Sequence, residues 1–134
     1  QGKGHIVTNM GLESGEVPYT TFMMRKDTIE NEPGFAAAFV RAIYRAQKWV
    51  WAAGDEEVAY AMQSYFPDTD IATLSAVAKS YRATDSWTRV PTMTEDAFTR
   101  LQDILDGAGE LAARIELSEL VDNSFGEAAI SEIG

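Results

Sequence analysis

The chain has 134 residues, a hydrophobic fraction of 46%, a charged fraction of 24% and a formal net charge of −10. Its length suits one domain with a single moderate core, and its composition is that of an ordinary globular protein. The acidic balance argues against binding to nucleic acid or to an anionic membrane surface, because both require basic protein surface. The absence of cysteine excludes disulfides, thiol nucleophiles and cysteine-ligated metals.

The N-terminal residues predict two short strands. Residues 1–4 are polar and lack an initiator Met, so we expect a processed or truncated product with any export signal upstream. Residues 5–10 (HIVTNM) indicate a first strand, and the Gly, Ser and Pro content of residues 11–18 indicates a loop. Residues 19–24 are rich in β-branched and aromatic side chains, which favour a second strand.

The strongest helix signal begins at Pro33 and ends before Gly54. The fixed φ of proline suits a first helical turn, and glycine is common just past a helix end. An apolar stripe recurs at steps of three and four residues. Its members are Phe35, Ala36, Phe39, Val40, Ile43, Ala46, Trp49 and Val50.

The aromatic residues of this helix fall into two groups. Phe35, Phe39 and Trp49 lie on the stripe and are expected to be core residues. Tyr44 and Trp51 lie off its centre and are expected to be exposed or to cover a second surface. Exposed apolar residues of this kind favour self-association.

Further helices follow, giving about five in total after the two strands. Cap residues and apolar spacing mark their starts. The expected caps or first residues are Asp55, a residue of the run 67–70, Thr92 or Thr94, and Asp122 or Asn123. Two short strands do not form a stable sheet alone, so we expect other strands from a partner subunit or from more of the same protein.

Side chains with catalytic or metal-binding potential have simpler structural explanations. His5 is the only histidine and has no cysteine or carboxylate pair beside it, so it predicts neither a zinc site nor a base–nucleophile pair. It is interpreted as an exposed strand or terminal residue, with a titrating switch as the alternative. Ser14 lacks the setting of a nucleophile elbow. The carboxylates at 55–57, 68 and 70 suit helix starts and turns, so we expect no catalytic residue, metal site or cofactor.

Three segments in a fixed order carry a family resemblance: GKGHIV, then SGEVPYTTFMMRKDTIENEP, then FAAAFVRAIYRAQKWV. With the later ELVDNSFGEAAI, the chain resembles the C-terminal part of ABC-transporter solute-binding proteins of the NMT1/THI5-like family. That family includes members that bind nitrate, sulfonates such as taurine, and pyrimidine precursors.

The resemblance implies an α/β fold of the periplasmic-binding-protein-like type II class, with two lobes that hold ligand between them. Residues 1–134 would then be a single domain and a mostly helical fragment. Residues 1–25 would supply crossover and sheet strands, and residues 33–134 the helical C-terminal part of a lobe. The remainder of the two-lobe protein would be missing.

The function implied is solute binding for an ABC importer, without catalysis or a cofactor. The complete protein would deliver a small organic or anionic solute to the permease, either in the periplasm or as a lipoprotein on the outer face of the cytoplasmic membrane. Two alternatives stay open. One is a pyrimidine-precursor (thiamine) synthase-like enzyme of the same fold family. The other is a free-standing acidic helical protein-interaction domain.

The expected ligand-binding residues lie at two places near the N-terminus. Thr8 and Asn9 belong to the predicted crossover strand, and Gly15, Pro18, Tyr19 and Thr20 form the junction between loop and second strand. Binding clefts need a few placed hydroxyl and amide groups beside aromatic walls, and these segments supply both. The alternative is that the threonines simply suit a strand. Surface exposed by truncation is also expected to favour a homo-oligomer.

Overall fold

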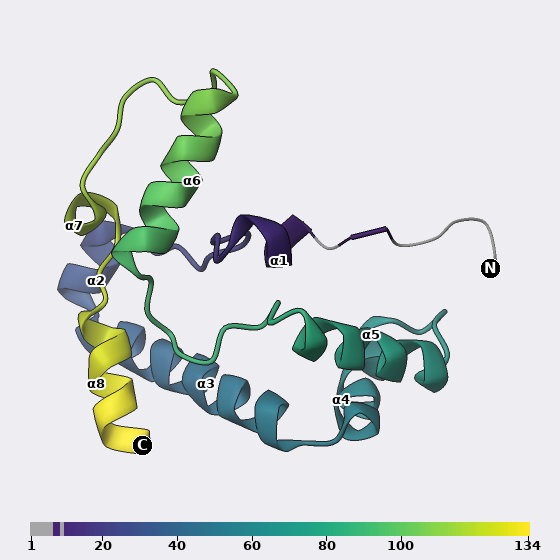
Figure 1. The fold of residues 1–134 in the computed structure, drawn as a ribbon. Helices are drawn as coiled ribbons and strands as arrows, with labels where there is room; N and C mark the ends of the chain where they lie inside the picture. The colour runs from purple at the N-terminus through teal and green to yellow at the C-terminus, as the bar shows by residue number, and fades with distance from the viewer. Residues whose placement is uncertain (1–6, 9) are drawn as a thin grey trace. The chain divides into compact units, whose positions relative to one another are not determined.

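A computed structural model describes residues 7–8 and 10–134 (Figure 1). The chain divides into two compact units, each built from two separate stretches. Unit 1 comprises Gln1–Met24 and Thr92–Asn123, and unit 2 comprises Arg25–Pro91 and Ser124–Gly134. The described residues form eight α-helices and one 3-10 helix.

Unit 2 is a helical unit centred on α3 (Pro33–Ala52). Its other helices are α2 (Lys26–Asn31), α4 (Asp55–Met62), η1 (Gln63–Tyr65), α5 (Ile71–Ala83) and α8 (Ser124–Ile133). Helix α3 packs against α2 and α8, while α4 packs against α5 (Figure 1). The buried apolar residues are mostly small, which lets the helices approach closely. They are Ala36, Tyr44, Val58, Ala59, Leu74, Ala78 and Ala129.

The prediction of α3 is confirmed at both ends, since Pro33 occupies the first turn and the helix ends before Gly54. Its buried face matches the predicted stripe only in part, since Ala36 of the stripe is buried as predicted. Tyr44 is only 6% exposed, whereas Phe35 is 55% exposed and Trp49 44% exposed. The prediction that Phe35 and Trp49 are core residues was therefore wrong, and of the two alternatives for Tyr44 the exposed one was wrong. The sequence alone does not show which elements cover each face of α3.

Local side-chain caps begin two of the helices as predicted. The Asp70 carboxylate accepts from the Thr73 backbone N–H at 2.7 Å, and the Thr94 hydroxyl accepts from the Ala97 N–H at 3.2 Å. Asp55 was predicted as a cap, but it is the first residue of α4 and Gly54 precedes it as the cap residue. Asp70 and Thr94 set the starts of their helices through short-range hydrogen bonding.

Unit 1 contains α1 (Met10–Ser14), α6 (Glu95–Gly107) and α7 (Leu117–Leu120). Buried Gln102 on α6 pairs with the backbone of Ile115 in both directions, donating at 3.1 Å and accepting at 2.9 Å. Arg114 bonds to Asp103 and Asp106 of α6 at 2.7 and 3.2 Å, and these carboxylates raise its pKa. The segment after α6 is thereby held back against that helix.

The predicted strands are not seen in the part of the chain that the structure describes. Residues 19–24 have no regular secondary structure, and residues 26–31, for which no element was predicted, form α2. Helix α1 lies where a loop was expected. His5, Ile6 and Asn9 of the first predicted strand lie outside the described residues, and Met10 begins α1. The described residues are mostly helical rather than α/β, because an extended segment becomes a strand only when another segment pairs with its backbone.

Candidate functional site

A loop in unit 1 carries most of the predicted ligand-binding residues. It follows α1 and starts at Gly15, whose φ of +80° lies in the left-handed region that glycine adopts readily. The Arg100 guanidinium of α6 donates to the Glu16 carbonyl oxygen at 2.7 Å. The Arg100 Cζ atom lies 3.2 Å from where a Cβ at position 15 would stand, so a side chain at this position would have to displace the guanidinium slightly.

The predicted residues differ in how the structure places them. Gly15, Pro18, Tyr19 and Thr20 lie in this one loop, where Pro18 is half-buried and Thr20 is exposed. Tyr19 is 97% exposed. Thr8 is also exposed and is separated from the loop by α1, while Asn9 lies outside the described residues. The loop therefore presents the phenol of Tyr19 and the hydroxyl of Thr20 to solvent, while Arg100 holds the start of the loop at Glu16.

A second feature is an open hollow in unit 2, with a volume of about 310 Å³. It is lined by Lys48, Trp51 and Ala52 of α3 and by Arg89 from the loop that follows α5. The Arg89 guanidinium lies over the Trp51 ring, 3.5 Å from its centroid. The sequence could have indicated part of this hollow, because residues 48, 51 and 52 share one face of a helix. No local sequence pattern places residue 89 against them.

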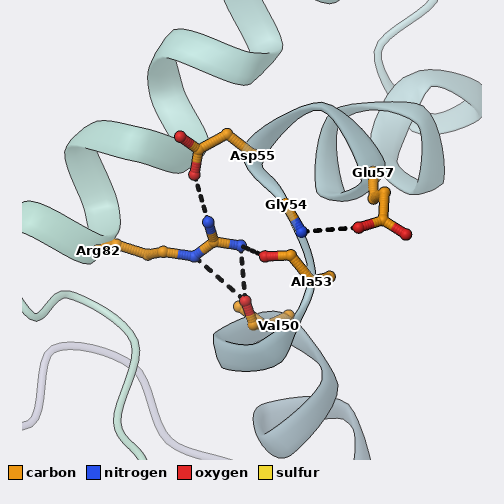
Figure 2. A network of polar contacts seen from close by, with 6 residues as sticks. All are labelled: Val50, Ala53, Gly54, Asp55, Glu57 and Arg82. Atoms are coloured by element: carbon orange, nitrogen blue, oxygen red, sulfur yellow. Dashed lines mark hydrogen bonds and ion pairs between the residues drawn. The ribbon is translucent and has the colours of Figure 1, made fainter.

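Arg82 joins the elements beside this hollow. Its guanidinium donates to the Val50 carbonyl oxygen at 2.7 and 3.2 Å and to the Ala53 carbonyl oxygen at 2.6 Å, and it pairs with the Asp55 carboxylate (Figure 2). These carbonyls lie at the C-terminal end of α3, where helix geometry leaves acceptors without partners. The Glu57 carboxylate accepts from the Gly54 N–H at 2.8 Å on the other side of the junction (Figure 2).

Neither metal binding nor a membrane span is indicated by the described residues. No three of their His, Asp or Glu side chains gather closely enough to hold a metal ion. None of the described helices is long and apolar enough to cross a bilayer.

Comparison with known proteins finds a relative that matches nearly the whole chain. The chain is 36% identical over 132 residues to "Putative binding protein YtlA" of Bacillus subtilis (strain 168). The chain is similar to a bacterial binding protein. The match covers 98% of this chain and 40% of the relative, so the chain spans about two fifths of that protein's length. No family model and no solved structure matches the chain.

Proposed function

We propose that this chain is part of a solute-binding protein of an ABC importer, of the NMT1/THI5-like type. The observation that carries the proposal is the similarity to a binding protein along nearly the whole chain. The order of the N-terminal loop, the polar segment and the long helix supports the same assignment. In this proposal the whole protein is more than twice as long as the chain, as the relative is.

The proposed mechanism is capture without chemistry. Two lobes close around a small organic or anionic solute because the closed state binds that solute more tightly than the open state. The loaded protein then docks on a permease at the outer face of the cytoplasmic membrane, either free in the periplasm or as a lipoprotein. Tyr19 and Thr20 contribute an aromatic wall and a hydroxyl to the cleft, and the isolated chain has too little of the cleft to bind the solute tightly.

A helical protein-interaction domain is the second candidate. It is favoured by the helical content of the described residues and by the net charge of −10, which suits a basic partner. A homo-oligomer would accompany either candidate if exposed apolar residues such as Tyr19 associate.

The test is a thermal-shift screen of the natural gene product that contains this sequence, with whatever flanking sequence its gene encodes. Nitrate, taurine, longer alkylsulfonates and hydroxymethylpyrimidine form the panel. A solute that binds only the folded state raises the melting temperature, and the shift grows with the ratio of the solute concentration to its dissociation constant. We expect one class to raise it, Tyr19→Ala and Thr20→Val to reduce that shift, and exposed Lys79→Gln to leave it unchanged. A protein that responds to no solute but binds a basic polypeptide would favour the second candidate.

A further inference from the structure

The hollow in unit 2 combines two cations with an aromatic floor in an otherwise acidic chain. The chain has 11 Lys and Arg against 21 Asp and Glu, yet Lys48 and Arg89 both line this hollow. Its volume of about 310 Å³ is at the small end of the range of small-molecule sites. Trp51 and Ala52 supply its apolar surface.

The aromatic floor is held in place before any ligand arrives. The Trp51 indole N–H donates to the Trp87 carbonyl oxygen at 3.2 Å. The Trp87 ring in turn meets the Tyr81 ring edge-on, with centroids 5.2 Å apart. Because these contacts fix the indole, little side-chain freedom is left to lose when a ligand packs against it.

The two cations keep donors for a ligand. Within the described part of the chain Arg89 has an ion pair with Asp85, in which Nε lies 3.7 Å from the carboxylate oxygen, beyond ordinary hydrogen-bonding distance. Both side chains of that pair are mostly exposed, and such pairs are weak. The Lys48 ammonium donates to the Gly134 carbonyl oxygen, and an ammonium has three donors in all.

We propose that this hollow binds a small aromatic carboxylate. The Arg89 guanidinium presents parallel N–H donors that match the two carboxylate oxygens, and Lys48 adds a second positive charge. Because the Arg89 guanidinium already covers one face of the Trp51 ring, 3.5 Å from its centroid, the aromatic ring of the ligand lies against the part of the indole that Arg89 leaves uncovered and against the methyl group of Ala52. The carboxylate displaces Asp85 as the partner of Arg89. This site lies entirely within unit 2 and does not depend on the solute-binding proposal.

Both parts of the ligand are required by this geometry. Acetate offers the charge without the ring, and benzyl alcohol offers the ring without the charge. Each should therefore bind more weakly than benzoate. If the hollow were only a positive surface, acetate and benzoate would bind alike.

The test is a titration of the 134-residue chain with benzoate, followed by the NMR signal of the Trp51 indole N–H. We expect this signal to shift and saturate in the millimolar range, while the indole signal of Trp49 moves little. Arg89→Gln and Lys48→Gln should each weaken binding about tenfold, and Asp85→Asn should strengthen it. Exposed Lys79→Gln is the matched control and should bind as the original chain does.

Three outcomes overturn the proposal. They are a Trp51 signal that does not respond to benzoate, acetate that binds as well as benzoate does, and binding that survives Arg89→Gln unchanged. Circular dichroism verifies that each variant is folded. If Arg89→Gln does not fold, Arg89→Lys replaces it; this variant keeps the charge but loses the planar fork, so weakened binding supports the proposal and unchanged binding refutes it.

Discussion

Arg82 offers the sharpest test of how unit 2 is held together. Its side chain is only 18% exposed, and its hydrogen bonds to Val50 and Ala53 and its ion pair with Asp55 connect the end of α3, the start of α4 and the last turn of α5. Replacing Arg82 by Gln removes the charge and leaves the two carbonyl oxygens short of donors. A hydrogen bond to a charged group contributes about 1.5–3 kcal/mol, and water can reach part of this junction. We therefore expect Arg82→Gln to lower the free energy of unfolding by about 2–4 kcal/mol.

The assay is urea unfolding followed by far-ultraviolet circular dichroism and tryptophan fluorescence. With a slope of about 2 kcal/mol per molar urea, the expected loss moves the midpoint by roughly 1–2 M. Arg82→Lys should recover only part of the loss, because one ammonium cannot match the planar fork that reaches two carbonyls and a carboxylate. The exposed Arg45→Gln on α3 is the control. A difference of less than about 0.5 kcal/mol between Arg82→Gln and this control would refute the reasoning.

Three further substitutions probe other parts of the chain. Gln47→Leu should leave the free energy of unfolding unchanged or raise it, because Gln47 Oε1 is a buried side-chain atom with no hydrogen-bond partner in the described structure; a clear loss in urea would contradict this. Asp70→Ala should lower the helix content near α5. Because donation by Thr73 lowers the pKa of Asp70, the contribution of this carboxylate to stability is present above about pH 4 and is lost as the pH falls further. Circular dichroism measured against pH tests this expectation. Gly15→Ala should lower the free energy of unfolding by about 1–2 kcal/mol, because φ is +80° and Arg100 leaves little room for a methyl group. An unchanged urea midpoint would refute this expectation.

The parts of the fold that were predictable are those decided by local chemistry. Pro33 and Gly54 mark the ends of α3, and Asp70 and Thr94 cap their helices, because each acts through backbone groups within a few residues. The strand predicted at residues 19–24 failed because a strand depends on a partner elsewhere, and propensity alone does not supply one.

The burial pattern of α3 and the hollow in unit 2 depend on contacts between residues that are distant in sequence. The apolar pattern of α3 placed Phe35 in the core beside Ala36, but Phe35 is exposed while Ala36 and Tyr44 are buried. The placement of Arg89 over Trp51 joins residues 38 apart in numbering, in a loop whose path no periodicity predicts. By contrast, the loop with Tyr19 and Thr20 was proposed for ligand binding from residue type alone, and it remains a prediction.

The most direct test of the central proposal is a calorimetric titration of the natural gene product with the solute that raises its melting temperature. We predict one solute per protein chain, weaker binding after Thr20→Val, and recovery of the solute chemically unchanged after long incubation. The absence of binding to every solute of the panel, or recovery of a converted product, would contradict a role in solute capture.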